Sequence, residues 1–370
     1  MKKIVFGITS LGIGGAERVL VDIANSLKDE YEITIFTLYG GGAFEKELDS
    51  KIKNISLYKM PYEDMKKIKQ RIIPIYVLNC GKNIYDKYIK NKFDIEVAFL
   101  EGPITRIFSN NGNSKKIVWV HNDIKKVFGN DLKSKIKQKI DKNVYRKFDN
   151  IVFVSNDNKE VFNTLYIMKK NEGMLRKEKV IYNYIDKERI FEKSKEQCEL
   201  NKRLLNNKII VTVARLVPQK AIDRLAKVHK KLIDEGIKNT IYVIGDGPEK
   251  ERLQKLIKDL KIEDTFKLLG KKENPYPYMI CADYFALLTY FEGYPMAVEE
   301  AKILNKKIII TDTAAKEVIK DYDRSKILKN DEESIYKGLK DILQEKSKFS
   351  SDEKKEYDNS YLLNEIKALF

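Results

Sequence analysis

Two cations lie five residues apart in the stretch Ala-Arg-Leu-Val-Pro-Gln-Lys at residues 214–220. The guanidinium of Arg215 can bind a phosphate through two parallel hydrogen bonds, and the ammonium of Lys220 can add a compact charge near a leaving oxygen. The stretch follows an apolar, β-branched run, so it should form the loop after a strand. The pair suits a diphosphate, although two cations on a loop are by themselves better explained as solvated surface residues.

Two carboxylates, Glu292 and Glu300, stand eight residues apart around the stretch Phe-Glu-Gly-Tyr-Pro. Glu292 should lie on the loop after an apolar run, and Glu300 more than one turn into the helix that follows. Carboxylates accept hydrogen bonds from the hydroxyls of a ribose or hexose. Glu299 should point about 100° away from Glu300 and face the solvent. The backbone of the turn should line the same site, at Gly293, Tyr294, Pro295 and Met296.

Glycines stand between the first predicted strand and the first helix, in the order Gly12-Ile13-Gly14-Gly15. They would let the backbone approach a ligand closely, and the helix N-terminus would offer free N–H groups to an anion. The spacing differs from the dinucleotide fingerprint GxGxxG, and the strand at 32–38 ends without the acidic residue that holds a ribose. The pattern disfavours a nicotinamide-dependent dehydrogenase and leaves either a ligand-binding loop or a tight strand–helix turn.

The chain has only two histidines. His121 follows a predicted strand, and its ordinary pKa of about 6.5 would suit a general base, although many histidines in turns only cap. His229 falls on the apolar stripe of a helical pattern and should be packed. Asp321 and Asp323 form a D-x-D triplet of the kind that can hold a divalent metal, but it follows a helical stretch and is better explained as exposed loop carboxylates. We therefore expect no metal site.

Four motifs follow one another along the chain: Gly-Gly-Ala-Glu-Arg (14–18), Ala-Arg-Leu-Val-Pro-Gln-Lys (214–220), Ile-Gly-Asp-Gly-Pro (244–248) and Phe-Glu-Gly-Tyr-Pro (291–295) with its E-x7-E spacing. Together they resemble the family 4 glycosyltransferases of bacterial cell-envelope and capsular polysaccharide synthesis. Each motif is weak alone, but four in order are specific, and the resemblance is strongest over residues 209–312. It implies a GT-B fold, retention of the anomeric configuration and independence from metal.

The resemblance also implies residue roles. Arg215 and Lys220 match the pair that neutralises the nucleotide diphosphate, and Glu300 matches the ribose-binding glutamate. Glu292 matches the position that contacts the donor sugar, with the backbone of 293–296 beside it. The implied catalytic residues are His121, Arg215, Lys220 and Glu292, and the implied donor-binding residues add Gly14, Gly15, Gly293, Tyr294, Pro295, Met296 and Glu300.

Some positions depart from the family or match it more loosely. Gly14 and Gly15 match a loop of the first domain over the diphosphate and acceptor, and His121 falls where a polar residue lies near the reacting centre. Ala221 stands where glycine is usual. Alanines at 314–315 replace the glycines that often follow the strand at 307–311, which puts a close backbone approach at that loop in doubt.

The loops that carry these motifs need strands to position them. Apolar, β-branched runs alternate with helical patterns in two series, as parallel α/β architecture requires. The first series covers 3–8, 32–38, 94–100, 116–120, 150–155 and 179–183, and the second covers 208–213, 241–245, 266–270, 283–288 and 307–311. We predict two doubly wound, Rossmann-like domains facing a cleft: an acceptor-side domain at 1–185, a nucleotide-sugar-binding domain at 186–350, and a C-terminal helix at 351–370 that crosses back.

The bulk composition is that of a globular, two-domain protein. The 370 residues are 43% hydrophobic and 10% aromatic, which is ample for burial. No stretch approaches the 18 apolar residues that suggest a membrane span, and the N-terminal apolar run is better explained as a strand than as a secretion signal. Three distant cysteines form no CxxC pair. We therefore expect a cytoplasmic protein without disulfides.

The net charge of +16 is uneven, because residues 51–150 hold 23 Lys and Arg against 10 Asp and Glu. The basic runs at 66–71 and 133–139 would attract nucleic acid or an anionic membrane, unless they are an ordinary solvated surface. An apolar stripe within 65–90 favours a membrane-surface acceptor, with core packing as the alternative. No RRM, KH or helix-turn-helix signature is present, so a basic nucleic-acid-binding protein is only an alternative of another class.

These observations predict transfer of a hexose or N-acetylhexosamine from a nucleotide sugar, with no cofactor and no divalent metal. Family frequency favours a UDP-sugar as the donor. The acceptor would be a lipid-linked or growing glycan, met at the inner membrane face through peripheral contact by residues 51–150. The alternative within enzymes is a GT-B-fold nucleotide-sugar epimerase or hydrolase, which would share the donor site.

Overall fold

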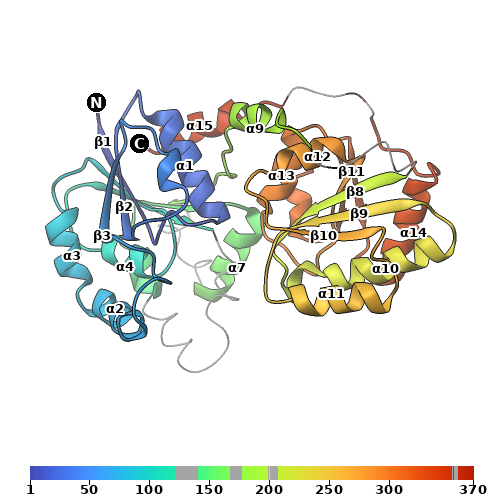
Figure 1. Cartoon of the computed structure of the whole chain (residues 1–370). Coiled ribbons are helices and arrows are strands. Elements are labelled where there is room, and N and C mark those ends of the chain that lie inside the picture. Colours follow the sequence, from blue (N-terminus) through green and yellow to red (C-terminus); the bar gives the residue numbers. More distant parts are fainter. Residues whose placement is uncertain (122–140, 167–176, 199, 201–206, 352, 354–356) are drawn as a thin grey trace. The chain divides into compact units, whose positions relative to one another are not determined.

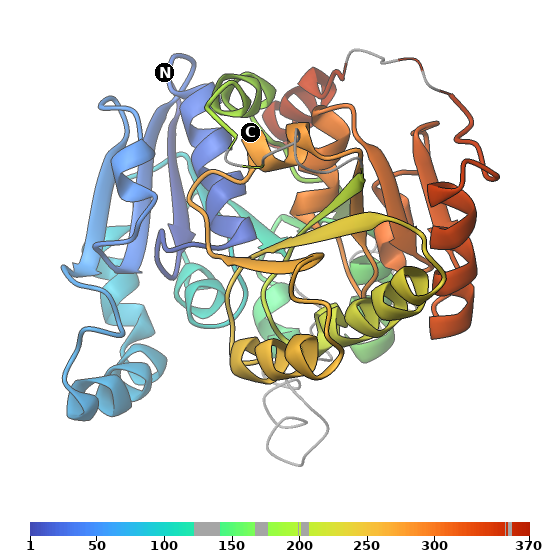
Figure 2. The ribbon, with the colours of Figure 1, turned by 45° about the vertical axis from the view of Figure 1, so that its right-hand side comes forward.

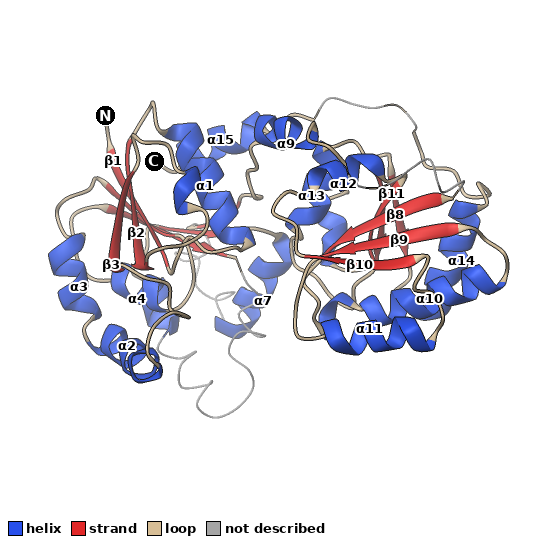
Figure 3. Cartoon of the chain, in the orientation of Figure 1, coloured by secondary structure: helices blue, strands red, loops and turns tan. Residues whose placement is uncertain are grey.

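The computed structural model describes residues 1–121, 141–166, 177–198, 200, 207–351, 353 and 357–370. The chain divides into two compact units: Met1–Asp186 with Asp358–Phe370 forms the N-terminal unit, and Lys187–Tyr357 forms the C-terminal unit (Figure 1). Each unit is a parallel β-sheet with helices packed around it (Figure 3). The basic run at 133–139 lies outside the described residues.

Within the described ranges, the N-terminal sheet has seven parallel strands in the order β3-β2-β1-β4-β5-β6-β7. Strand β1 is almost continuously apolar because helices cover both faces of a parallel sheet. The strands are β1 (Lys3–Ile8), β2 (Glu32–Tyr39), β3 (Lys53–Tyr58), β4 (Ile95–Ala98), β5 (Lys115–Val120), β6 (Asn150–Phe153) and β7 (Glu178–Val180). The helices are α1 (Gly15–Leu27), α2 (Lys67–Asn79), α3 (Gly81–Tyr88), α4 (Pro103–Phe108), α7 (Asn156–Tyr166) and α15 (Ser360–Lys367).

The C-terminal sheet has six described strands in the order β10-β9-β8-β11-β12-β13, again all parallel (Figure 2). The strands are β8 (Lys208–Val213), β9 (Asn239–Ile244), β10 (Phe266–Gly270), β11 (Tyr284–Leu287), β12 (Lys307–Thr311) and β13 (Ser325–Leu328). The helices are α9 (Lys187–Ser194), α10 (Ile222–Asp234), α11 (Lys250–Asp259), α12 (Tyr276–Cys281), α13 (Met296–Ile303) and α14 (Glu332–Leu343). The prediction of two doubly wound, Rossmann-like sheets is confirmed.

Two edge strands were not predicted from the sequence. Among the strands that the structure describes, β3 pairs only with β2, and β13 only with β12. Both are at most half-buried along their length, whereas the central strands are almost wholly buried. Edge strands carry a weak apolar pattern because one side has no neighbouring strand and their faces are only partly covered. Their position, therefore, depends on the sheet that they extend.

A buried ion pair joins two neighbouring strands of the N-terminal sheet. Lys116 of β5 contacts Glu96 of β4, and both side chains are nearly inaccessible to solvent. Lys116 Nζ also donates to the Tyr85 hydroxyl at 3.0 Å and to the carbonyl of Phe108 at 2.8 Å. Tyr85 in turn donates to the second carboxylate oxygen of Glu96 at 2.9 Å. The charges are thus satisfied inside the core, as buried ions must be.

The helix α15 belongs to the N-terminal unit. Asn359, just before it, donates its side-chain amide to the carbonyl of Ile185 at 2.7 Å. Beyond the helix, the Phe370 ring packs edge-on against Phe6 and Tyr31. In the part of the chain that the structure describes, no helix combines the length and the apolar character needed to cross a bilayer.

Candidate functional site

The loops after β8 and β11 meet at the middle of the C-terminal sheet. The two strands are neighbours, yet the chain continues from β8 to β9 on one side and from β11 to β12 on the other. Such a reversal of strand order opens the crevice in which doubly wound sheets bind ligands, beyond the carboxyl ends of the strands. Arg215 and Lys220 lie after β8, and Glu292 lies after β11. The topology therefore brings the predicted cations and the first predicted glutamate to one place.

Lys220 and Glu292 contact each other directly. The distance from Lys220 Nζ to Glu292 Oε1 is 2.5 Å, and 18% and 7% of the two side chains are exposed. Gln219 connects the same two loops, because its side-chain amide donates to the carbonyl of Phe291 at 2.9 Å and its own carbonyl accepts from Tyr290 N–H at 3.0 Å. Sequence analysis missed Gln219, whose role depends only on the loop opposite. The two loops form one hydrogen-bonded structure.

Arg215 is exposed, and no side chain in the described ranges pairs with its guanidinium. Its loop is supported by the exit of β9. A Cβ atom on Gly245 would lie 1.9 Å from the carbonyl oxygen of Ala214, and one on Gly247 would lie 2.3 Å from that of Leu216. Gly245 also has a φ of +148°, which few other residues adopt. The glycines of the 244–248 motif therefore let two backbones pack closely and hold Arg215 at the crevice.

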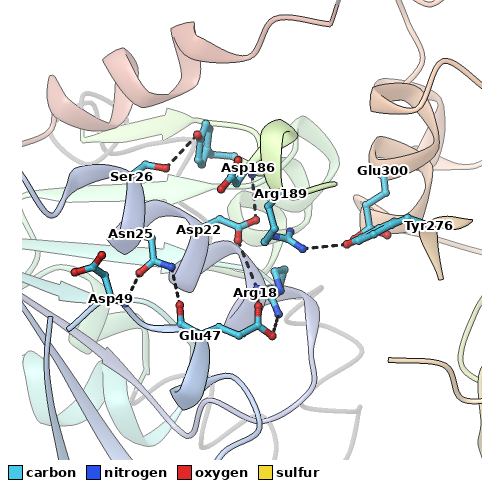
Figure 4. Close-up of polar contacts among 11 residues, drawn as sticks. Arg18, Asp22, Asn25, Ser26, Glu47, Asp49, Asp186, Arg189, Tyr276 and Glu300 are labelled. Carbon is cyan, nitrogen blue, oxygen red and sulfur yellow. Dashed lines mark hydrogen bonds and ion pairs between the residues drawn. The ribbon is translucent and has the colours of Figure 1, made fainter. Parts of the chain in front are cut away.

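Glu300 lies on α13 and is fixed by two residues that sequence analysis missed (Figure 4). The Tyr276 hydroxyl donates to Glu300 Oε1 at 3.0 Å, and Arg189 of α9 donates to the same hydroxyl oxygen at 3.3 Å. Burial, and then the charge of Glu300, raises the pKa of Tyr276 far above neutrality, so the phenol keeps its proton. No local spacing relates these three residues, because they come from three helices. Their meeting depends on the packing of the unit.

Glu299 corrects an expectation, because it is buried rather than solvent-facing. Only 2% of the residue is exposed. Its carboxylate accepts from the Tyr294 hydroxyl at 3.0 Å and from the Tyr357 hydroxyl, and Lys302 Nζ lies 3.7 Å away. Glu299 and Glu300 do point in different directions from α13, but both directions face other parts of the protein, because α13 is covered on more than one side. Glu299 thereby holds the turn at Tyr294 against α13.

The predicted turn 293–296 precedes α13 directly. Gly293 and Tyr294 are half-buried, Pro295 is buried, and Met296 is the first residue of the helix. Glu292, on the preceding loop, is therefore held close to the start of α13, and Glu300 lies one turn further along that helix. The C-terminal unit thus gathers the predicted residues after β8 and β11, with the direct contact of Lys220 and Glu292 as its centre.

The corresponding loop of the N-terminal unit follows β1, which is also at a reversal of strand order between β1 and β4. Gly14 precedes α1 in extended conformation, and Gly15 is the first helical residue. Gly42, which sequence analysis did not single out, packs closely against this loop. A Cβ atom on Gly42 would lie 2.4 Å from the backbone of Leu11. Glycines at both positions allow the close approach of two loops beyond the sheet.

Arg18, from the same motif, is engaged within the N-terminal unit (Figure 4). Its guanidinium makes two 2.8 Å hydrogen bonds to the Glu47 carboxylate and lies 3.8 Å from the centre of the Phe44 ring. Asp22 lies 3.6 Å from Arg18 and accepts from the backbone N–H of Asp186 at 3.1 Å. This cation therefore stabilises the first helix and the end of the unit, and differs from the exposed Arg215.

His121 follows β5 and lies in an apolar, largely closed setting. Its ring is 4.8 Å from the Phe99 ring, its backbone N–H donates to Glu101 at 2.5 Å, and its carbonyl accepts from Asn158 at 3.1 Å. Its Nε2 atom is buried, without a partner among the described residues. Burial lowers the pKa of His121 to about 3, so the ring is neutral near pH 7. A neutral imidazole can donate or accept a hydrogen bond, but such a low pKa makes a weak general base.

The D-x-D triplet at residues 321–323 is not part of a described cluster of metal-ligating side chains. Asp321 and Asp323 are both exposed in a turn. Among the described residues, no three His, Cys, Asp or Glu side chains lie together in a way that could hold a metal ion.

The chain is similar to known glycosyltransferases. Residues 193–358 match the family described as glycosyl transferases group 1. An uncharacterised glycosyltransferase of Methanocaldococcus jannaschii is 28% identical over 220 residues, which cover 58% of this chain and 53% of that protein.

A second relative is matched over nearly its whole length. The N-acetylgalactosamine-N,N′-diacetylbacillosaminyl-diphospho-undecaprenol 4-α-N-acetylgalactosaminyltransferase of Campylobacter jejuni is 28% identical over 358 residues, covering 93% of this chain and 91% of that protein. Among solved structures, an Anabaena protein in complex with UDP and glucose superimposes with a TM-score of 0.70 at 17% identity, covering 95% of this chain and 92% of the other. The chain therefore shares the GT-B fold, its residues 193–358 match the group 1 glycosyl transferases, and it is similar to bacterial glycosyltransferases over nearly its whole length.

Proposed function

We propose that the chain transfers a hexose or N-acetylhexosamine from a UDP-sugar to a lipid-linked or growing glycan of the cell envelope, with retention of configuration and without a metal. One observation carries the donor site: the exposed, unpaired Arg215 lies in the same loop as the Lys220–Glu292 pair, at the reversal of strand order of the C-terminal sheet. The UDP and glucose bound by the Anabaena neighbour support the choice of donor. The undecaprenol diphosphate in the name of the Campylobacter relative supports the choice of acceptor.

The chemistry of transfer assigns each residue a task. The bond from the anomeric carbon to the diphosphate breaks, and negative charge grows on the departing phosphate oxygen. Arg215 and Lys220 would stabilise that charge without a metal. Glu292 would contact the donor sugar, and Glu300, aligned by Tyr276, would accept hydrogen bonds from the ribose hydroxyls.

The new bond joins the acceptor oxygen to the anomeric carbon. With retention, the acceptor approaches from the face that the diphosphate leaves, and its hydroxyl proton passes to a phosphate oxygen. His121 is then not needed as the base, which fits its low pKa. A hydrogen bond from its neutral ring to a substrate hydroxyl is the role that we propose instead, beside the loop of Gly14 and Gly15. Such a protein would act at the cytoplasmic face of the membrane, with peripheral contact through residues 51–150.

Isothermal titration calorimetry with UDP, GDP, ADP and UDP-sugars, in the absence of divalent metal, tests the donor site. We expect micromolar binding of UDP that is lost in Arg215→Ala and Glu300→Ala. Arg252→Ala and Glu251→Ala, which change exposed residues of α11, serve as matched controls and should bind as the wild type does. If UDP binding survives both site substitutions, the assignment of this site is wrong. If GDP or ADP binds instead, the site stands and the donor changes.

A further inference from the structure

The helix α2 has two apolar faces, and only one of them is buried. Ile73 and Val77 are 4% and 3% exposed and belong to the core of the N-terminal unit. Ile68, Ile72 and Ile75 are 72%, 56% and 60% exposed. The helix lies at the outer edge of its unit (Figures 1 and 2). Packing in the core accounts for the apolar residues Ile73 and Val77. It does not account for the exposed isoleucines on the other face.

The exposed apolar residues form one continuous stripe. Ile68, Ile72 and Ile75 are spaced by four and three residues, so they lie above one another on the same side of the helix. Tyr76, also 45% exposed, borders them. Single exposed apolar residues are normal on soluble proteins, but a contiguous group marks a contact surface. We therefore expect the stripe to contact a partner that has an apolar region.

Basic residues flank this stripe on both sides. With 100° between successive residues, Lys67 and Arg71 fall on one side of the isoleucines and Lys69 falls on the other. All three are exposed, and no acidic side chain in the described part of the chain pairs with them. The partner should therefore be negatively charged around an apolar centre.

We propose that this face of α2, defined by Lys67, Ile68, Lys69, Arg71, Ile72 and Ile75, docks on an anionic lipid bilayer. The isoleucines would enter the boundary between headgroups and acyl chains, while the cations would remain among the lipid phosphates, as in helices that lie in a membrane surface. A second copy of the chain would bring like charges together, and a nucleic acid would not need the central isoleucines. The contact deepens the proposed function by naming the surface that meets a lipid-linked acceptor, but it does not depend on the donor site.

Sedimentation with vesicles tests the contact in the full chain. The vesicles contain equal parts of phosphatidylglycerol and phosphatidylcholine, or phosphatidylcholine alone. We expect binding to the anionic vesicles only, weakened by salt. Replacing Lys67, Lys69 and Arg71 by Gln should lower the affinity about 100-fold. Replacing Ile68, Ile72 and Ile75 by Ser should lower it about ten-fold or more. The matched control Ile280→Ser with Ile327→Ser, which alters exposed isoleucines of the C-terminal unit, should bind as the wild type does.

Several results would overturn this proposal. They are absence of binding to the anionic vesicles, binding that survives both α2 variants, and a wild-type dimer in solution that the serine variant dissociates. Urea denaturation followed by the fluorescence of Trp119, in the N-terminal unit, checks that each variant is folded, and UDP titration tests the donor site separately. If no variant, including the wild type, binds UDP while the vesicle results hold, the proposed donor site fails and the membrane contact stands.

Discussion

Each unit contains a lysine–glutamate pair, and the two pairs differ in their surroundings. Lys116 and Glu96 lie within the N-terminal sheet, where Tyr85 and the carbonyl of Phe108 complete their hydrogen bonds. Lys220 and Glu292 lie on loops beyond the C-terminal sheet, and neither side chain has another hydrogen-bond partner among the described residues. The first pair is saturated by the protein, whereas the second keeps hydrogen-bonding capacity for a ligand.

The two histidines show the same contrast. In the C-terminal unit His229 is fully buried, with one ring nitrogen 2.9 Å from Asn239 and the other 2.8 Å from Thr265. In the N-terminal unit His121 leaves Nε2 without a described partner, beyond the carboxyl end of β5. The comparison teaches that buried polar groups can be saturated by the protein, as at His229, or can keep an unused hydrogen-bonding atom, as at His121.

The largest expected effect concerns the saturated pair. Glu96→Ala leaves Lys116 as an uncompensated buried charge and should lower the free energy of unfolding by about 3–5 kcal/mol. The measurement is urea denaturation followed by fluorescence of Trp119, the only tryptophan, which is buried in the same strand, β5, three residues after Lys116. Adding Lys116→Met should recover part of the loss. A change below about 1 kcal/mol in Glu96→Ala would contradict the view that this pair is structural.

A pH series tests whether His229 is structural. Burial lowers its pKa from 6.5 to about 4, so the unfolded chain takes up a proton below pH 6.5 that the folded chain refuses until about pH 4. Stability due to this group is therefore complete above pH 6.5 and falls by on the order of 3 kcal/mol towards pH 4. In His229→Gln, the slope of unfolding free energy between pH 6 and 5 should be smaller by about 1.4 kcal/mol per pH unit. Denaturation followed by circular dichroism measures it, and an unchanged slope would assign the acid sensitivity elsewhere.

The unsaturated pair should respond in activity rather than stability. Glu292→Gln keeps the shape of the side chain and removes its charge, so we expect kcat/KM to fall about 100-fold. The free energy of unfolding should change less than in Glu96→Ala, because Lys220 is 18% exposed and can reach water when its partner is neutral, whereas Lys116 is enclosed. UDP affinity should change little, since Glu292 is assigned to the sugar. If Glu292→Gln loses stability but keeps its activity, the Lys220–Glu292 pair is structural, like Lys116 and Glu96.

Removal of one hydroxyl group tests how Glu300 is aligned. Tyr276→Phe removes the hydrogen bond to Glu300 and should weaken UDP binding about ten-fold, because hydrogen bonds to charged groups contribute about 1.5–3 kcal/mol. The loss should be absent for 2′,3′-dideoxy-UDP, which lacks the ribose hydroxyls. Tyr278→Phe on the same helix is the matched control. An equal loss for both nucleotides would show that Tyr276 acts only through packing.

The smallest effect is expected at Ala221, where the family usually has glycine. Ala221 has a φ of +50°, a left-handed conformation that costs an alanine about 1 kcal/mol. The residue is also 1% exposed, so Ala221→Gly would lose a buried methyl group that contributes about 0.8 kcal/mol. The two effects nearly cancel, and thermal denaturation should show a difference below about 1 kcal/mol. A larger gain would mean that the loop of Lys220 is strained.

The sequence predicted the central strands better than the edges or the side-chain environments. The runs at 3–8, 208–213 and 307–311 coincide with strands because continuous burial gives a continuous apolar pattern. Half-buried β3 and β13 lack that pattern. Glu299 was predicted to be exposed because helix geometry gives a direction and not the identity of the neighbour in that direction.

By itself, the sequence determined the elements that alternate along the chain, the charges that follow β8 and β11, and the glycine turns at 12–15 and 244–248, because these are properties of a few neighbouring residues. Only the tertiary structure decided which of them meet. It placed Lys220 against Glu292 and Tyr276 against Glu300, and it buried Ile73 while leaving Ile72 exposed. These outcomes depend on strand order and on packing between distant segments, which no local pattern of residues specifies.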